Sequence, residues 1–215
     1  AGVREVYEAA FRQAGILWAS TTEEMLELAA AFASLPLSRG NRVGILTRGG
    51  GWGVITADAC NELGLEVPPL DESIVRKLDI LLPAFWSRGN PVDMVATMGM
   101  GPYIQCLEAL IAWEKVDAVI SLSGDAGPLA HLLPDIKKKA EGILPSEKTD
   151  KIVQQVSEGR ARIYERVCEL VEKYRKPVFA VGANFPRGKG SGKSDFSLAQ
   201  FRSPERAAKA AGVMY

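Results

Sequence analysis

The 215-residue sequence holds three cysteines, Cys60, Cys106 and Cys168, and a single histidine, His131. Three widely spaced cysteines make no disulfide framework, and they indicate reduced thiols in a cytoplasmic setting. Each lies in a helical pattern, which favours the role of a small core residue. One histidine without any Cys-x-x-Cys pair argues against a zinc site, and we expect no metal to be bound by this chain.

The chain also lacks an excess of charge of either sign and any long apolar run. Lysine and arginine together number 26, as do aspartate and glutamate, which argues against a nucleic-acid or membrane-surface partner. No apolar run approaches the roughly 20 residues that a spanning helix requires, and no signal segment stands at the start. The hydrophobic fraction of 47% is ample for a folded core. We therefore expect a cytoplasmic α/β protein.

From Gly40 onward, short apolar runs alternate with helical patterns. This alternation predicts a doubly wound parallel sheet with helices on both faces. The expected strands are residues 42–47, 65–67, 116–122, 177–181 and 199–202. Residues 89–93 are expected to form a rigid turn. The expected helices are residues 54–63, 71–81, 102–115, 152–174 and 204–214. Asp71 is expected to cap the second of these and Ser203 the last. The stretch 129–147 is uncertain.

The first 39 residues are predicted to form a helix, a short strand at 16–19 and a second helix. Thr21 and Glu24 form a capping box that opens the second helix. Proline and glycine then mark a linker at 34–40. Because this piece is too small for a domain, we expect residues 1–39 to be the tail of a preceding domain and its linker, and 40–215 to be the main domain.

A glycine-rich turn, Thr47-Arg48-Gly49-Gly50-Gly51-Trp52-Gly53-Val54, stands where the first strand should pass into a helix. Glycine lets a backbone approach a ligand closely. A helix that begins here directs unpaired N–H groups and the positive end of its dipole at that ligand. The alternative is a tight connection that packs the helix on the sheet, and no named nucleotide fingerprint matches. The candidate phosphate-binding residues are Gly49, Gly50, Gly51, Trp52 and Gly53.

Three further segments have features of a binding site. Gly188-Lys189-Gly190-Ser191-Gly192-Lys193-Ser194 resembles a nucleotide loop, but its spacing is one residue short and no helical pattern follows, so we interpret it as a solvated basic loop. His131 has no nucleophile near it in sequence and fits a surface or capping residue. The loop that begins Gly124-Asp125 follows the strand at 116–122, at the edge where parallel sheets bind ligands. Possible substrate-side residues are Gly124, Asp125, Asn90 and Asp93.

Several stretches together carry a family resemblance. They are residues 40–47, 50–54, Ala57-Asp58-Ala59, Gly64-Leu65-Glu66, Leu81-Leu82-Pro83, Gly89-Asn90-Pro91-Val92-Asp93, Lys176-Pro177-Val178 and 201–207. This set resembles the NDP-forming acyl-CoA synthetases, relatives of succinyl-CoA synthetase and of ADP-forming acetyl-CoA synthetase. The match is to the carboxyl-terminal part of the alpha-type subunit. Residues 1–16 are similar to the segment that directly follows the family's phosphorylated histidine.

The resemblance implies a flavodoxin-like CoA-ligase domain over 40–215 and a phosphoryl relay. In that relay an acyl-CoA and phosphate give an acyl phosphate, a histidine takes the phosphoryl group, and a nucleoside diphosphate receives it. CoA, ATP or ADP, phosphate and Mg²⁺ would serve the full enzyme, with none bound by this chain. The implied partners are CoA-binding and phosphohistidine domains of the same chain, a nucleotide-grasp domain or subunit, and a second copy of the chain. Asp93 would be structural or cap a neighbouring segment.

This sequence departs from the family pattern in several respects. The phosphorylated histidine, expected ahead of Ala1, is absent, so no catalytic residue is assigned and the chain is expected to be inactive alone. Arg48 stands where an uncharged polar residue is common. Trp52 replaces a proline or small residue, and it either covers the helix or lines an acyl or CoA pocket. Two alternatives remain open: a non-catalytic regulatory or docking domain, for example one fused to an acetyltransferase, and a flavin-binding domain.

Overall fold

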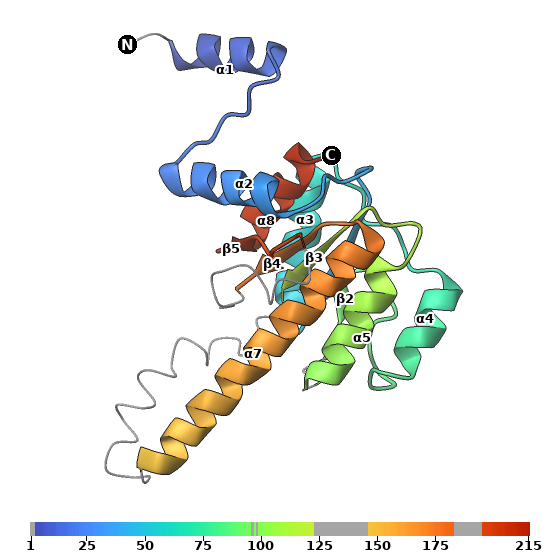
Figure 1. The fold of residues 1–215 in the computed structure, drawn as a ribbon. Helices are drawn as coiled ribbons and strands as arrows, with labels where there is room; N and C mark the ends of the chain where they lie inside the picture. Colours follow the sequence, from blue (N-terminus) through green and yellow to red (C-terminus); the bar gives the residue numbers. More distant parts are fainter. Residues whose placement is uncertain (1–2, 96, 98, 123–145, 183–194) are drawn as a thin grey trace.

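The centre of the fold is a five-stranded parallel sheet in the order β2-β1-β3-β4-β5. The computed structural model describes residues 3–95, 97, 99–122, 146–182 and 195–215 (Figure 1). β1 and β3 pair over their full length, from Val43 beside Ala118 to Thr47 beside Leu122. The predicted α/β class with a parallel sheet is therefore confirmed. The strands are β1 Val43–Thr47, β2 Val92–Asp93, β3 Ala118–Leu122, β4 Val178–Val181 and β5 Gln200–Phe201.

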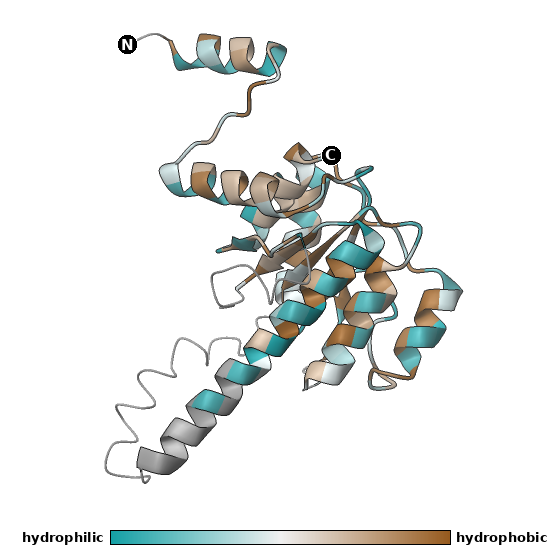
Figure 2. Cartoon of the chain, in the orientation of Figure 1, coloured by the Kyte–Doolittle hydropathy of each residue, from teal (hydrophilic) through white to brown (hydrophobic). Residues whose placement is uncertain are grey.

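Helices cover both faces of this sheet. Every residue of β1 and β3 is buried, which requires cover on both sides because successive side chains point to opposite faces. Figure 1 shows α2, α3 and α8 on one side and α4, α5 and α7 on the other, and Figure 2 shows apolar strands between them. The bounds are α1 Arg4–Gln13, α2 Thr22–Ser34, α3 Gly50–Glu62, α4 Glu72–Asp79, α5 Met100–Ile111, α7 Ser146–Tyr174 and α8 Pro204–Val213. Among the residues that the structure describes, no helix combines the length and apolar composition needed to cross a bilayer.

Two strand predictions and one turn prediction were wrong. Residues 16–19 form no strand, because their exposed backbone has no neighbouring strand to pair with. At 65–67 only Glu66 forms a bridge, with Arg42, and Pro68-Pro69 ends the pairing because proline has no N–H to donate. The expected turn at 89–93 instead contains β2, which pairs with the end of β1 and forms the edge of the sheet.

The helix ends bear out two of the three predicted caps. Thr21 accepts a bond from the Glu24 N–H at 3.1 Å, and Ser203 accepts one from the Arg206 N–H at 3.4 Å. Asp71 makes no capping bond, which corrects the prediction. Its carboxylate instead accepts from Trp113 Nε1 at 2.9 Å and Lys115 Nζ at 2.8 Å, so it joins α4 to the loop after α5.

The first two helices differ in how they relate to the sheet domain. α1 has no buried residue and lies apart from the rest of the fold (Figure 1). α2 packs against α8, burying Leu28 and Ala31, and ion pairs join Glu24 to Lys209 and Glu27 to Arg206. The domain boundary at residue 39 stays a prediction.

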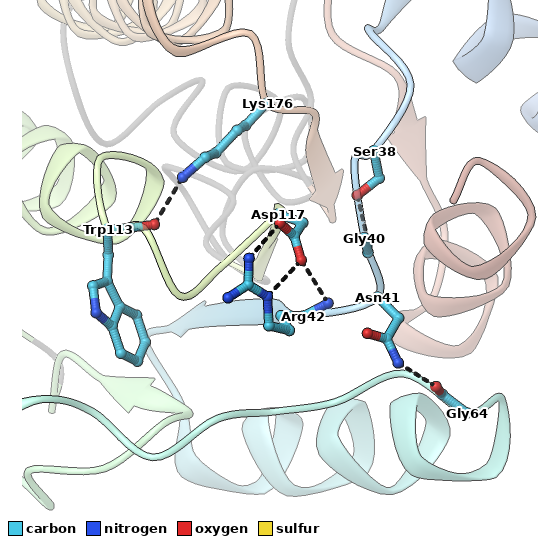
Figure 3. A network of polar contacts seen from close by, with 8 residues as sticks. All are labelled: Ser38, Gly40, Asn41, Arg42, Gly64, Trp113, Asp117 and Lys176. Carbon is cyan, nitrogen blue, oxygen red and sulfur yellow. Dashed lines mark hydrogen bonds and ion pairs between the residues drawn. The ribbon is translucent and has the colours of Figure 1, made fainter.

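A polar network holds the amino edge of the sheet, opposite the edge where strands lead into the candidate site (Figure 3). The Asp117 carboxylate accepts from the Arg42 backbone N–H at 3.2 Å and from its Nε and Nη2 at 2.8 Å each. These bonds lower the pKa of Asp117. Lys176 donates from Nζ to the Trp113 carbonyl at 2.7 Å. The network ties the start of β1 to the start of β3.

The three cysteines are core residues, as predicted. All are buried and none is in a disulfide, and burial raises the pKa of the Cys60 and Cys106 thiols to about 12 and that of Cys168 to about 11. They therefore stay protonated near neutral pH and have no thiolate character.

Candidate functional site

The glycine turn lies where β1 passes into α3, at the carboxyl edge of the sheet. β1 ends at the fully buried Thr47, and Gly49 is the N-cap of α3. Thr47 Oγ1 accepts from the Gly49 N–H at 3.0 Å and donates to the Gly49 carbonyl oxygen at 2.9 Å. α3 begins at Gly50, four residues ahead of the expected Val54, so the later glycines form its first turn. Thr47 thus fixes the point at which the helix begins.

The first turn of α3 presents backbone donors without a side-chain cap. The N–H groups of Trp52 and Gly53 both reach the Gly49 carbonyl oxygen, at 3.1 and 3.3 Å. The N-cap Gly49 makes no side-chain capping bond, and within the described residues no side chain accepts from the N–H groups of Gly50 and Gly51. An α-helix leaves its first N–H groups without intrahelical acceptors, and here those of Gly50 and Gly51 lie on exposed residues. The turn can therefore receive an anion.

The structure requires glycine at some of the four glycine positions of the turn and not at others. A Cβ on Gly53 would lie 3.0 Å from Pro91 Cβ and 3.1 Å from Thr47 Cγ2, so close packing requires glycine there. A Cβ on Gly50 would lie 3.0 Å from Asp93 Oδ2. At Gly49 and Gly51 a Cβ would meet nothing within 4 Å, and Gly49 has an ordinary extended backbone with φ −148°. Packing and backbone conformation thus do not explain the glycines at 49 and 51.

Asn90 and Asp93, two of the candidate substrate-side residues, bind backbone groups beside this turn. The Asn90 amide accepts from the Ile45 N–H at 2.9 Å and donates to the carbonyl oxygens of Val43 and Pro68 at 3.0 and 3.1 Å. Asp93 Oδ1 accepts from the Val95 N–H at 2.9 Å. Asn90 therefore holds β2 and its preceding loop against the edge of β1.

Trp52 lies at the boundary between the helix and the end of β4. Its side chain is large and the residue is 47% exposed. The ring stands over Gly182, where a Cβ would lie 3.7 and 3.8 Å from Trp52 Cζ3 and Cη2. The indole therefore joins the start of α3 to the end of β4, with about half of its surface left to solvent.

Arg48 belongs to a second group at the same edge, which sequence reasoning did not assign to the site. Its guanidinium carbon lies 5.5 Å from the centre of the Tyr103 ring, and Nη2 donates to the Gly99 carbonyl oxygen at 3.3 Å. The Tyr103 hydroxyl lies 2.9 Å from Ser121 Oγ near the end of β3. The available signal was a lone arginine between a buried strand and a glycine turn, but its partner Tyr103 is 55 residues away.

Two of the candidate substrate-side residues, Gly124 and Asp125, lie outside the described part of the chain. So do His131 and the loop 188–194, which sequence reasoning did not assign to a site. Within the described residues, no group of three or more histidine, cysteine, aspartate or glutamate side chains is placed to hold a metal ion.

No protein-family model matches the chain. The alpha subunit of acetate–CoA ligase [ADP-forming] II from Pyrococcus furiosus is 35% identical over 187 residues, which cover 83% of this chain and 39% of that subunit. The chain belongs to the family of ADP-forming acyl-CoA synthetases. A second relative, 4-hydroxybutyrate–CoA ligase [ADP-forming] from Nitrosopumilus maritimus, is 30% identical over 143 residues, or 64% of this chain and 20% of that protein.

Solved structures share the fold of this chain. A crystal structure from Pyrococcus horikoshii OT3 aligns with a TM-score of 0.69 at 30% identity, covering all of this chain and 44% of the other. The dinucleotide-forming acetyl-CoA synthetase 1 of Ca. Korarchaeum cryptofilum aligns with a TM-score of 0.65 at 23% identity, covering all of this chain and 41% of the other, and it supports the fold alone. The chain thus spans about two fifths of the length of the Pyrococcus furiosus subunit and of these two solved structures.

Proposed function

We propose that this chain is part of an NDP-forming acyl-CoA synthetase. That enzyme would convert acyl-CoA, a nucleoside diphosphate and phosphate to the acid, CoA and a nucleoside triphosphate. The reaction would run in both directions through a phosphohistidine. In this proposal the first turn of α3 binds the phosphoryl group. The observation that carries it is the uncapped helix end at Gly50 and Gly51, in a chain related to ADP-forming CoA ligases.

The chemistry asked of this turn is to hold a phosphoryl group and then release it. Two backbone N–H groups and the helix dipole favour a dianion without moving any side chain during the reaction. Such a helix end contributes roughly 0.3–1 kcal/mol at an exposed site and up to about 2 kcal/mol when partly buried. This modest stabilisation suits transfer in both directions, since a tighter site would trap the phosphoryl group.

The other components belong to the proposal as well. The histidine and the CoA-binding domain would come from sequence ahead of Ala1, and the nucleotide with its Mg²⁺ would bind a nucleotide-grasp domain or subunit. Relatives named for acetate and for 4-hydroxybutyrate point to a short carboxylic acid as substrate. Residues 1–39 would be the end of the phosphohistidine-bearing domain.

The phosphoryl-binding role is tested on the 215-residue chain by NMR. Inorganic phosphate is titrated into ¹⁵N-labelled protein at constant ionic strength, with chloride as the control anion. We expect saturable shifts centred on the Gly50 and Gly51 amides, with weak affinity. Shifts spread over the surface, or equal shifts with chloride, would contradict the role.

The relay itself is tested by a turnover assay. The chain alone, given ATP, Mg²⁺, CoA and acetate, should form no acetyl-CoA, because the proposal places the phosphorylated histidine outside it. Turnover by the chain alone would contradict the relay.

A further inference from the structure

Among the residues that the structure describes, Arg48 differs from most arginines in having no carboxylate partner. Arg42, Arg88 and Arg206, for example, each lie within about 3 Å of an aspartate or glutamate oxygen. Within the described residues, no carboxylate oxygen lies within 4 Å of Arg48, and its Nε is buried without a hydrogen-bond partner. A cation left without an anion, next to a turn that presents free N–H groups, gives this edge of the sheet a local positive charge.

Two contacts hold the Arg48 side chain although no acid pairs with it. The guanidinium lies over the Tyr103 ring, and it donates to the Gly99 carbonyl at the N-cap of α5. Tyr103 is 2% exposed, and its hydroxyl contacts Ser121. Arg48, which directly precedes the first glycine of the turn, is therefore tied to the first turn of α5 and, through the ring, to the end of β3.

A carboxylate that lies beside the turn gives this positive charge a function. Asp93 Oδ2 lies close to Gly50, as the 3.0 Å approach to a Cβ built there shows. A carboxylate at that distance repels an incoming anion, and one bond from the Val95 N–H does not remove its charge. Arg48 reaches toward β3, whereas Asp93 ends β2 on the opposite side of β1, so the Arg48 guanidinium adds a positive charge at the same edge of the sheet.

We propose that Arg48 is a positioning residue of the phosphoryl site, which holds the glycine turn against α5 and supplies the charge that offsets Asp93. This inference rests on the proposed function, because it concerns affinity for the same phosphoryl group. Arginine suits the role better than lysine, since a planar guanidinium stacks on the tyrosine and donates at the same time.

The test is the phosphate titration repeated on Arg48→Met, Arg48→Lys and the matched control Arg4→Met. Arg48→Met keeps the length of the side chain and removes its charge, and we expect phosphate to bind about tenfold more weakly. Arg48→Lys restores the charge without the stacking and should recover part of the loss. Arg4→Met removes the same charge from the separate helix α1 and should leave the affinity unchanged.

The salt dependence separates charge from a purely structural role. Phosphate affinity of the wild type should fall with ionic strength more steeply than that of Arg48→Met, because the variant has lost a charge near the site. Equal salt dependence, or full affinity in Arg48→Met while Gly51→Asp abolishes binding, would overturn the inference and leave the proposed function standing. Absence of phosphate binding in the wild type would instead overturn both.

Discussion

Gly51 is the position where the fold and the proposed site make opposite demands. Alanine fits the fold better, since a Cβ at 51 meets nothing within 4 Å and alanine favours a helix over glycine. Near a helix end we expect Gly51→Ala to raise the free energy of unfolding by about 0.5 kcal/mol, or roughly 1–2 °C in Tm. Phosphate binding should weaken, because helical Cα–Cβ bonds tilt toward the amino end and place the methyl group where the anion would sit.

Gly51→Asp should separate fold stability from phosphate binding more clearly than Gly51→Ala. An acidic residue in the first turn stabilises a helix by about 0.3–1 kcal/mol, so the variant should fold at least as stably as the wild type. Its carboxylate repels phosphate and competes for the same N–H groups, so binding should be lost.

The matched control for these variants is Gly159→Ala in α7. Gly159 is also helical with open space at its Cβ, and it lies far along the chain from the turn. Alanine there should add about 1 kcal/mol of stability in a helix interior and leave phosphate affinity unchanged. The assays are thermal unfolding by circular dichroism and the NMR titration. Wild-type phosphate affinity in Gly51→Asp would refute the reasoning, because the glycines would then serve the fold alone.

Three further predictions concern stability. Gly53→Ala should destabilise the fold by about 1–2 kcal/mol in chemical unfolding, because its Cβ meets Pro91 and Thr47; no loss would mean that α3 can shift. Asn90→Ala should cost about 3 kcal/mol by leaving the buried Ile45 N–H without its acceptor, and a loss under about 1 kcal/mol would contradict that. The lowered pKa of Asp117 means that its stabilisation is present above the unfolded-state pKa and is lost as pH falls below about 4, so unfolding of Asp117→Asn should depend less on pH in that range. Identical acid profiles would exclude Asp117 as a contributor.

The central strands and the turn could be predicted from sequence because their signals are local. β1, β3 and β4 are short apolar runs that become wholly buried, and the glycine turn follows the first of them directly. The cap at Ser203 depends on residues within three positions. Such features need no knowledge of the distant chain.

The parts that sequence reasoning missed depend on distant partners. β2 exists because Asn90 binds the backbone at Val43 and Ile45, more than 40 residues away. Asp71 is predicted to cap a helix, but its carboxylate instead accepts hydrogen bonds from the distant Trp113 and Lys115. The role of Arg48 could not be predicted, because its contact with Tyr103 forms only when α5 packs beside the end of β1. A local pattern could not distinguish these pairings from ordinary surface residues.

The most direct test of the central claim is a crystal structure of the chain grown or soaked in inorganic phosphate. We predict phosphate density at the amino end of α3, with oxygens about 2.7–3.1 Å from the N–H nitrogens of Gly50 and Gly51. Ordered phosphate elsewhere with none at this turn, or a turn closed by Trp52, would contradict the account. The glycines would then be explained by architecture alone.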